Sequence, residues 1–390
     1  MNALYRCLAL IPGLLCGISL NAQQMPPGSG VAVNPVTLNP AENLHRIKLP
    51  EGFKIEIYAN NVPGARSMSL GPDGTLYVGT QSTASRENIG KVYAVRDQDG
   101  DGVAETVKVA VEGLNMPNGV AIHDGNLYVA ELERLVRFDA IAKHPDKAPE
   151  PKVLDSGFGN TWMHGWKFLR FGPDGRLYMA VGSPCNNCVP DDRHGQIVRM
   201  DADGGNREVF ASGVRNSVGF DWQPETGELW FTDNGRDMWG DDIPPDELNH
   251  APNAGLHFGF PYSYGKATAD KDFTPPAGLE LQPAALELPP HNAAIGMRFY
   301  TGAAFPETYR KQLFIAQHGS WNSSTPVGYR VILVRIENNQ AVGWEDFANG
   351  WLMEDKHYWG RPVDLEVMPD GALLVADDHA GVIYKISYGK

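Results

Sequence analysis

The chain has 390 residues, of which 47 are acidic and 33 basic, and its formal net charge is −14. This charge argues against a nucleic-acid or anionic-membrane partner, because a phosphate-rich surface would repel the protein. Hydrophobic residues make up 42% of the chain, which supplies a core and excludes disorder throughout, and the 43 glycines and 29 prolines favour a turn-rich, all-β protein over a helical one.

The first 22 residues have the layout of a secretory signal peptide. Arg6 supplies a positive charge, an apolar run extends from Cys7 to Leu20, and the chain then becomes polar, with cleavage expected after Ala22. A lipidated Cys16 is the alternative, although the leucines before it match poorly to the small residue that lipidation requires. The run is short for a bilayer span, and no later stretch approaches about 20 apolar residues. We therefore expect a periplasmic or secreted protein with no membrane insertion.

A repeated phrase begins after the next segment, residues 23–48, whose polar, proline-rich composition predicts an extended N-terminal arm. From residue 49 onward, a short apolar stretch, a turn such as Gly-Pro-Asp-Gly and an apolar strand recur in that order. Six copies align on Leu76, Leu127, Leu177, Leu229, Leu313 and Leu373, with separations of 51, 50, 52, 84 and 60 residues. The period is therefore about 50 residues, with one insertion at about 233–297.

Each repeat has the content of one propeller blade. Asp-Gly between apolar runs is a strong hairpin signal, and further strands lie between the hairpins, as at residues 90–95 and 196–200. A unit of about 50 residues with about four short strands matches a blade, and six units close a ring without exposed edges. We predict one all-β domain at 49–390, a six-bladed β-propeller in which residues 53–58 join 381–386 to close the ring. A β-sandwich is the alternative, but it does not explain the regular spacing.

Asp97, Asp99 and Asp101 alternate along an acidic turn that ends in Gly102. The pattern resembles the start of a calcium loop, because alternate carboxylates can face one ion. Lys108 stands at the twelfth position, where an EF-hand carries glutamate, and flanking helices are not evident. A structural calcium site and a solvated acidic turn therefore both stay open.

Cleavage of the signal peptide would leave two cysteines, Cys185 and Cys188, separated by two asparagines. A local disulfide is the favoured interpretation because the compartment is oxidising. A redox-active dithiol lacks the βαβ pattern that accompanies such motifs, and Val189 stands where covalent haem attachment needs histidine. No second ligand pair is spaced for a zinc site.

The segment at about 233–297 carries Trp239 and an aromatic run between Gly259 and Gly265. Long loops on one face of a propeller often carry specificity. These aromatic side chains, and Trp321 further along, could stack on a ligand or pack over a blade.

Residues that flank the hairpins indicate a ligand site. In an antiparallel hairpin, the residue before the first strand and the residue after the second lie at the same end. Those before the hairpins are Arg66, Asn118, His164, Arg215 with Asn216, Arg298 and Arg361; those after them are Gln81, Glu131, Ser183, Asp233 with Asn234, His318, and Asp377 with Asp378. In a ring these ends converge on one channel mouth. Four arginines there predict an anionic ligand, with salt bridges to the carboxylates of the mouth as the alternative.

His164 lies at a strand start with Gly165 beside it, which leaves room for a ligand. A lone histidine is often structural, but the position of His164 beside arginines makes a role as general base equally favoured.

Six motifs together resemble one family. They are Met163 to Phe168 (Met-His-Gly-Trp-Lys-Phe), Gly-Val-Arg-Asn-Ser at 213–217, Gly-Glu-Leu-Trp-Phe-Thr-Asp-Asn-Gly at 227–235, Pro-Asp-Glu-Leu-Asn at 245–249, His-Phe-Gly-Phe-Pro at 257–261, and Gly-Arg-Pro-Val-Asp at 360–364. In that order they resemble the pyrroloquinoline-quinone-dependent sugar dehydrogenases, of the L-sorbosone and soluble aldose dehydrogenase type. The resemblance covers residues 45–390.

The resemblance implies a tricarboxylate quinone over a calcium ion at the mouth of a six-bladed propeller. His164 matches the family's base, which takes the proton from the anomeric hydroxyl while hydride passes to the quinone. Arg215 matches the arginine that stabilises charge on the quinone oxygen, with Asn216 as its neighbour at the cofactor. Arg361 matches a binder of a cofactor carboxylate, and Asn118 lies near a contacting amide. Main-chain carbonyls of Gly235 and Arg236 match the calcium ligands.

Several positions depart from the glucose-oxidising branch of that family. Met163 and Ser183 replace carboxylates around the base, so a different group must orient His164. His318 replaces a cofactor-binding lysine and would contribute only a partial charge. Val363 replaces a second arginine, and Arg236, which replaces a proline, could supply some of that charge.

These features predict an oxidoreductase that transfers hydride from an aldose, aldosone or similar sugar alcohol group to pyrroloquinoline quinone, giving a lactone or acid. The predicted cofactors are pyrroloquinoline quinone and Ca²⁺. No haem motif is present, so electrons must leave to a separate acceptor such as a cytochrome or quinone carrier. The alternatives are a calcium-dependent lactonase or esterase on the same fold, and a propeller that binds a glycan or protein without catalysis.

Overall fold

The computed structural model describes residues 35–81, 89–143 and 148–389. The predicted signal peptide and residues 23–34 of the predicted arm lie outside these ranges. Residues 40–46 form helix α1 (Pro40–Asn43) and one turn of 3-10 helix, η1 (Leu44–Arg46). The division into arm and propeller stays a prediction.

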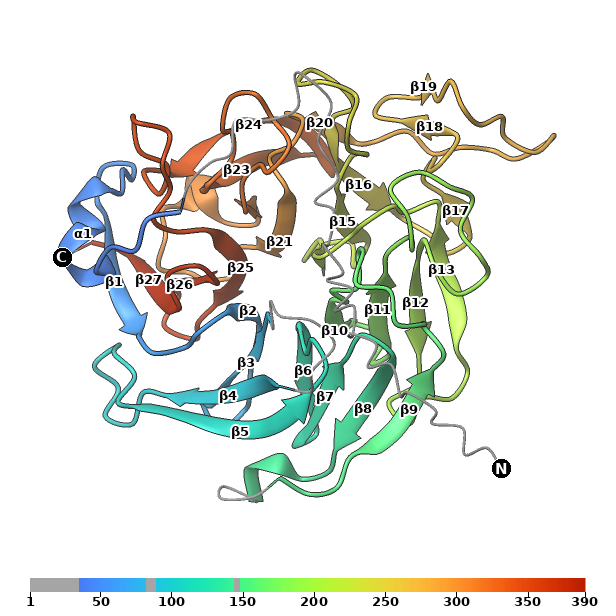
Figure 1. The fold of residues 1–390 in the computed structure, drawn as a ribbon. Coiled ribbons are helices and arrows are strands. Elements are labelled where there is room, and N and C mark those ends of the chain that lie inside the picture. Colours follow the sequence, from blue (N-terminus) through green and yellow to red (C-terminus); the bar gives the residue numbers. More distant parts are fainter. Residues whose placement is uncertain (1–34, 82–88, 144–147, 390) are drawn as a thin grey trace, which may run out of the picture.

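Six antiparallel sheets form a ring, which confirms the predicted propeller (Figure 1). The first three blades are β2 (Ala65–Leu70), β3 (Leu76–Thr80), β4 (Gly90–Arg96) and β5 (Thr106–Leu114); β6 (Gly119–His123), β7 (Asn126–Ala130), β8 (Arg134–Phe138) and β9 (Lys152–Ser156); and β10 (Leu169–Phe171), β11 (Leu177–Val181), β12 (Gln196–Met200) and β13 (Glu208–Ser212). The last three are β14 (Phe220–Trp222), β15 (Leu229–Asp233), β16 (Asp246–Ala251) and β20 (Leu286–Leu288); β21 (Ala294–Phe299), β22 (Leu313–Gln317), β23 (Arg330–Glu337) and β24 (Gln340–Ala348); and β25 (Pro362–Val367), β26 (Leu373–Asp377), β27 (Val382–Tyr388) and β1 (Phe53–Ala59).

The aligned leucines mark the second strand of each blade. Five of the six open that strand, and Leu127 is the second residue of β7. The turn before β3 shows why the phrase recurs: Gly74 has φ +81°, and Asp73 Oδ1 accepts the N–H of Thr75 at 3.1 Å. Glycine takes the left-handed conformation at no steric cost, and the aspartate holds the turn.

The ring closes through strands from the two ends of the described chain. β1 pairs antiparallel with β27, and Phe53 lies opposite Tyr388. Figure 1 shows the blue β1 beside the red β27. This is the predicted closure, and it leaves no open edge between the first and last blades.

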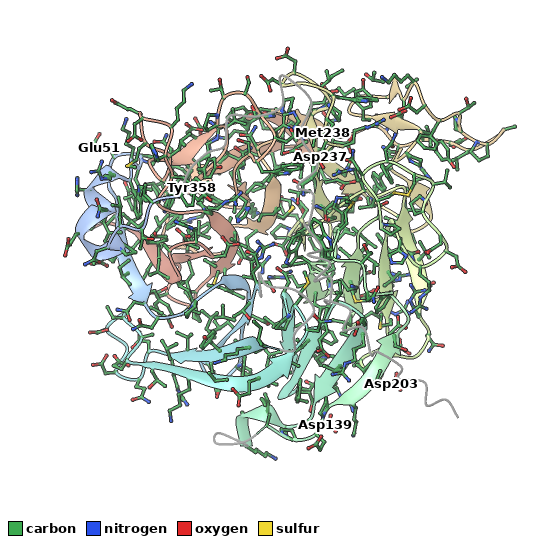
Figure 2. All side chains as sticks on the ribbon, viewed as in Figure 1. Glu51, Asp139, Asp203, Asp237, Met238 and Tyr358 are labelled. Carbon is green, nitrogen blue, oxygen red and sulfur yellow. A yellow bond between two sulfur atoms is a disulfide. The ribbon has the colours of Figure 1, made fainter. Side chains whose placement is uncertain are left out.

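The core lies between neighbouring blades. Side chains of β3 such as Leu76 and Val78 pack against Leu374 and Ala376 of β26, and Trp230 of β15 packs into a cluster with residues of β21 and β22. Figure 2 draws the side chains of the ring and shows that many of them lie in the spaces between the sheets. Because each sheet buries both faces, its central strands are continuous apolar runs, as in β22 and β26.

The segment predicted as an insertion is partly ordinary blade. β16 and β20 complete the fourth blade, and only β17 (Leu256–His257) and the hairpin of β18 (Ser263–Tyr264) and β19 (Thr268–Ala269) are additional. β17 adds parallel to β13. The remaining 3-10 turns are η2 (Ile141–Lys143) and η3 (Glu307–Tyr309). Within the described ranges, every helix is too short or too polar to cross a bilayer.

Candidate active site

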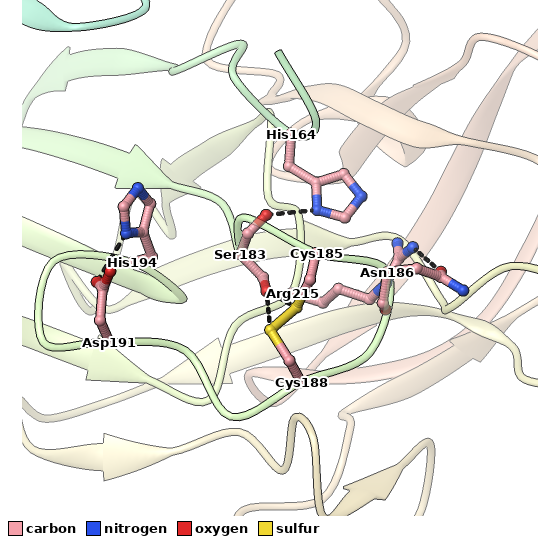
Figure 3. The surroundings of a disulfide bond; sticks show 8 residues. All are labelled: His164, Ser183, Cys185, Asn186, Cys188, Asp191, His194 and Arg215. Carbon is pink, nitrogen blue, oxygen red and sulfur yellow. Dashed lines mark hydrogen bonds and ion pairs between the residues drawn. A yellow bond between two sulfur atoms is a disulfide. The ribbon is translucent and has the colours of Figure 1, made fainter. Parts of the chain in front are cut away.

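His164 lies in the loop before β10, where its backbone takes the left-handed conformation with φ 52°. Its Nδ1 lies 2.8 Å from the main-chain oxygen of Ser183 (Figure 3). A carbonyl oxygen can only accept, so Nδ1 carries the proton, and the neutral ring leaves Nε2 as an acceptor. Burial, together with the Arg215 guanidinium, lowers the pKa of His164 to about 3, against the Ser183 hydrogen bond, which raises it. His164 therefore has the tautomer and charge of a general base, and the group that orients it is a main-chain carbonyl.

Arg215 is buried and held by oxygens on three sides. Its Nε donates to Asn186 O at 3.0 Å, its Nη1 to Asn234 O at 3.0 Å, and its Nη2 to Asn186 Oδ1 at 2.7 Å and Asp237 Oδ2 at 3.0 Å. Asp237, labelled in Figure 2, lies in the loop that follows β15. These bonds use four of the five N–H groups of a guanidinium. One N–H on Nη1 has no partner among the described residues, and it remains for a ligand.

The main chain at Arg215 is fixed separately by Asp233. Its carboxylate accepts the N–H of Arg215 at 2.7 Å and that of Asn216 at 2.5 Å. Asp233 therefore holds the backbone of this loop, and the ion pair of the Arg215 side chain is with Asp237 instead.

Arg66, Asn118 and His318 meet around Asp378, which joins three blades. Arg66 Nε donates to Asn118 Oδ1 at 2.7 Å and Nη1 to Asp378 Oδ2 at 2.9 Å, while Asn118 Nδ2 donates to Lys167 O at 2.8 Å. His318 Nε2 donates to Asp378 Oδ1 at 2.9 Å. Burial and the Arg361 guanidinium lower the pKa of His318 to about 4, although Asp378 opposes them. With Nε2–H given to Asp378, the neutral ring offers only an acceptor, so Arg66 and Arg361 carry the positive charge here.

The side chain of Arg361 donates only to main-chain carbonyl oxygens among the described residues. Its Nε donates to His318 O at 3.0 Å and its Nη2 to Gly319 O at 2.7 Å, and its guanidinium carbon lies 5.3 Å from the ring centre of Tyr358. Asp377 accepts the main-chain N–H of Arg361. Of the mouth arginines, Arg66 and Arg215 have carboxylate partners and Arg361 has none in the described parts of the chain.

Arg298 is a correction to the predicted mouth. It lies four residues inside β21, opposite Phe314, and is fully buried. Its Nη2 lies 3.1 Å from Glu366 and 3.6 Å from Asp364. β21 begins at Ala294, so Arg298 lies past the end that faces the mouth, and its charge serves a buried ion pair between blades five and six.

An apolar floor lies immediately inside the mouth. Val218, Ile295 and Val363 are buried together and pack with Trp166. Trp166, Val218 and Val363 each follow a mouth residue (His164, Asn216 and Arg361) by two positions, so they lie further inside the channel. Around this floor, three buried atoms have no partners in the described structure, namely Trp166 Nε1, Asn216 Oδ1 and Asn234 Oδ1. Orphaned buried groups indicate a ligand or ordered water, and the arginines of the mouth offer donors to an anion.

The Gly235–Arg236 turn is held from behind. Asp246 Oδ1 accepts the N–H of Gly235 at 3.0 Å, and no main-chain N–H of the described residues donates to the carbonyl oxygen of Gly235 or Arg236. Both carbonyls therefore remain able to bind a cation. A small cavity of about 30 Å³ lies against the turn and reaches Glu247. Burial raises the pKa of Asp246 to about 6 and, with Asp233 nearby, that of Glu247 to about 8.

The Arg236 side chain does not supply the charge that is absent at Val363. Its Nη1 lies 3.1 Å from Asp270 and 3.0 Å from Asp272, and its guanidinium stacks on Trp239 at 4.0 Å. Two aspartates of the additional hairpin region therefore neutralise it, which argues against the expectation that it supplies some of the charge absent at Val363. Trp239 packs on Arg236 and Tyr264.

The disulfide between Cys185 and Cys188 is present, as predicted. It lies in the loop between β11 and β12, directly beside His164 and Arg215 (Figure 3).

The acidic turn lies at the far end of the first blade. Val95 at the end of β4 pairs with Leu76 at the start of β3, whereas the other end of β3, at Thr80, faces the mouth. Oxygens of Asp97, Asp99, Asp101 and Glu105 lie within 4.8 Å of one another. The turn is thus apart from the channel site, and Glu105 joins the three predicted aspartates.

Three groups that hold the candidate catalytic side chains could not be predicted from residue types. Asn186 and Asp237 hold Arg215, and the Ser183 main-chain oxygen orients His164. The only available signal was the position of Asn186 between two cysteines.

Comparison with known proteins places the chain in a family. Residues 39–387 match the family described as "Domain of unknown function (DUF7133)". An uncharacterised protein of Borreliella burgdorferi is 33% identical over 92% of this chain and 95% of its own length. The aldose sugar dehydrogenase YliI of Escherichia coli is 26% identical over 252 residues, which are 58% of this chain and 61% of that protein.

Solved structures share the fold at low identity. The holo pyrroloquinoline-quinone domain of pyranose dehydrogenase from Coprinopsis cinerea has a TM-score of 0.71 at 20% identity and covers 87% of this chain and 97% of its own. A calcium structure of a Trichoderma reesei family AA12 enzyme has a TM-score of 0.72 at 20% identity, covering 91% and 99%. The quinone-bound aldose sugar dehydrogenase of Streptomyces coelicolor has a TM-score of 0.61 at 17% identity, covering 87% and 99%. The resemblance predicted from the motifs is confirmed, since this chain shares its six-bladed ring with the solved quinone-dependent sugar dehydrogenases, and the chain belongs to the DUF7133 family.

Proposed function

We propose that the protein is a pyrroloquinoline-quinone-dependent sugar dehydrogenase that oxidises an aldose, aldosone or similar sugar alcohol group to a lactone or acid. The observation that carries the proposal is His164, a neutral imidazole with an unprotonated Nε2 beside the Arg215 guanidinium. Such a group can take the hydroxyl proton of a sugar as its carbon is oxidised.

The residues at the mouth suit a tricarboxylate quinone. Arg361 and the remaining N–H of Arg215 supply donors, Asn216 presents an unpartnered oxygen, and Asn118 is fixed beside Arg66. When bound, pyrroloquinoline quinone supplies the acceptor for the two electrons of the reaction. The Gly235 and Arg236 carbonyls would hold Ca²⁺ next to it, because hard oxygen ligands suit that ion. His318, whose N–H is given to Asp378, would orient Arg361 through its main-chain oxygen instead of binding a cofactor carboxylate.

The wider setting follows from the same proposal. A secreted or periplasmic location fits the predicted signal peptide, and electrons would pass to a separate carrier. The alternative of a calcium-dependent lactonase would need a metal held by carboxylates of the channel; in the described ranges, the close group of metal-ligating side chains is the acidic turn at the far end of the first blade.

The test is reconstitution of the apo-protein with the quinone and Ca²⁺, followed by dye reduction with a panel of sugars. His164→Gln should bind the quinone with unchanged affinity and lose about 10²- to 10⁴-fold in kcat, the usual contribution of a general base. His194→Gln is the matched control, since His194 bonds Asp191 and Phe158 O in the same region. Absence of both a quinone absorbance change and dye reduction in the wild type would refute the proposal.

A further inference from the structure

Both candidate catalytic side chains are attached to one short segment, residues 183–188 in the loop between β11 and β12. Ser183 contributes its main chain in both directions: its oxygen accepts His164 Nδ1–H at 2.8 Å, and its N–H donates to Arg215 O at 2.7 Å. One residue, through its two flanking peptide groups, therefore couples the base to the loop that carries the arginine.

Asn186 makes the second attachment. Its main-chain oxygen accepts Arg215 Nε–H at 3.0 Å, and its Oδ1 accepts Arg215 Nη2 at 2.7 Å. The same side chain is pinned to the loop after β15, because Oδ1 also accepts Asp237 N at 2.8 Å and Nδ2 donates to Asp237 O at 3.2 Å. The guanidinium plane is thus set by Asn186 and Asp237 together.

The disulfide closes this segment on itself. Cys185 and Cys188 bracket Asn186, and their Cα atoms are 6.1 Å apart. The fully buried Ser183 hydroxyl lies 3.2 Å from Cys185 Sγ and 4.0 Å from Cys188 Sγ. Figure 3 shows the bridge next to Ser183, with His164, Arg215 and Asn186 around it. The segment is irregular backbone outside any strand, and the bridge restricts the conformations that it can adopt.

We propose that the Cys185–Cys188 ring positions the active site, with Ser183 O setting the tautomer of His164 and Asn186 setting the plane of Arg215. Asn186 is a positioning residue that acts through Arg215. The inference deepens the proposed function and rests on it for the roles of His164 and Arg215, but the two attachments themselves exist in the apo-protein.

The first test reads His164 without any cofactor. In ¹⁵N-histidine-labelled apo-protein, with the signal assigned by His164→Gln, we expect a protonated Nδ1 and an unprotonated Nε2 from pH 5 to 8. The double variant Cys185→Ser/Cys188→Ser should show mixed tautomers or a broadened signal, whereas Asp191→Ala, in the same loop outside the ring, should keep the wild-type signal. A wild-type His164 signal in the double variant overturns the proposal.

The second test reads Arg215 and leaves the disulfide intact. Asn186→Ala should expose the Arg215 Nε–H to faster solvent exchange, weaken quinone binding about 10-fold and lower kcat, with an unchanged His164 signal. Asn186→Asp, which keeps an oxygen at Oδ1, should restore part of the affinity. Unchanged exchange and affinity in Asn186→Ala would reject the role of this residue.

The outcomes separate the two proposals. If the wild type binds no quinone, the proposed function fails, while the histidine tautomer and the arginine exchange rate still decide whether the ring positions these groups. If the wild type is active but neither variant changes these signals, the positioning role fails alone.

Discussion

Gly182 packs against His164, and Gly182→Ala adds one carbon atom there, which tests how strictly the position of His164 is required. A Cβ at this position would lie 2.6 Å from His164 Cβ and 2.8 Å from His164 O, where ordinary contact begins at 3.4 Å. The neighbours are backbone-fixed atoms, so His164 must shift by about 0.8 Å, the difference between 3.4 and 2.6 Å. A misplacement of about 1 Å can cost about 10²-fold in rate, and we expect kcat to fall about 10- to 100-fold.

The stability of the variant should change much less than its activity. Overpacking at one core position costs about 1–3 kcal/mol, which lowers the melting temperature of a protein this large by a few degrees. Gly343→Ala is the control, because a Cβ there meets no atom within 4 Å and the backbone is not left-handed. The assay combines dye-reduction kinetics, quinone titration and thermal unfolding. Wild-type kcat with an unshifted His164 ¹⁵N signal would refute this account of the base.

Two further predictions concern the acidic turn and the buried Lys167. Saturating Ca²⁺ should raise the melting temperature of the wild type by binding to the acidic turn. Asp99→Ala should lose most of that gain, whereas Asp203→Ala, which lies in a comparable turn, should keep it. An equal calcium response in Asp99→Ala would show that the turn is not a calcium site. Burial lowers the pKa of Lys167 to about 7, whereas its value in the unfolded chain is about 10.4. Between these two pH values the unfolded chain binds one more proton than the folded protein. The free energy of unfolding should therefore rise with pH, by up to about 1.4 kcal/mol per pH unit. Lys167→Met should flatten this rise, measured by denaturant unfolding at pH 7 and 9, and an unchanged slope would contradict the assignment.

Periodicity was sufficient to predict the ring. The leucines that align the repeats open the second strands because a buried central strand needs an apolar run immediately after its turn. The pairing of β1 with β27 also followed, since a closed propeller needs the terminal strand to complete its last blade. These features depend on local pattern and on closure, both of which a sequence displays.

Side-chain direction was less accessible. Arg298 was placed at the mouth by its spacing from the hairpin, but β21 begins four residues earlier and contains an irregularity in its register, so the side chain enters the interior. The orienting group of His164 is a main-chain oxygen, which every residue type carries. Arg236 was expected near the cofactor, yet the two aspartates that neutralise it lie more than thirty residues further along the chain. Contacts of this kind depend on three-dimensional packing and leave no local signature.

Closure of the ring has a consequence for how the protein matures. Arg66 and Asp378 are 312 positions apart, and their ion pair forms only when the first and last blades meet. Contacts of such long range close late, because loop entropy opposes them until the rest of the chain is ordered. The part of the mouth around Arg66 and Asp378 is therefore expected to form last during folding. Uptake of a ligand by Arg66, Asn118 and Arg361 would report that the whole polypeptide has folded, and a chain cut short before β27 would have no such site.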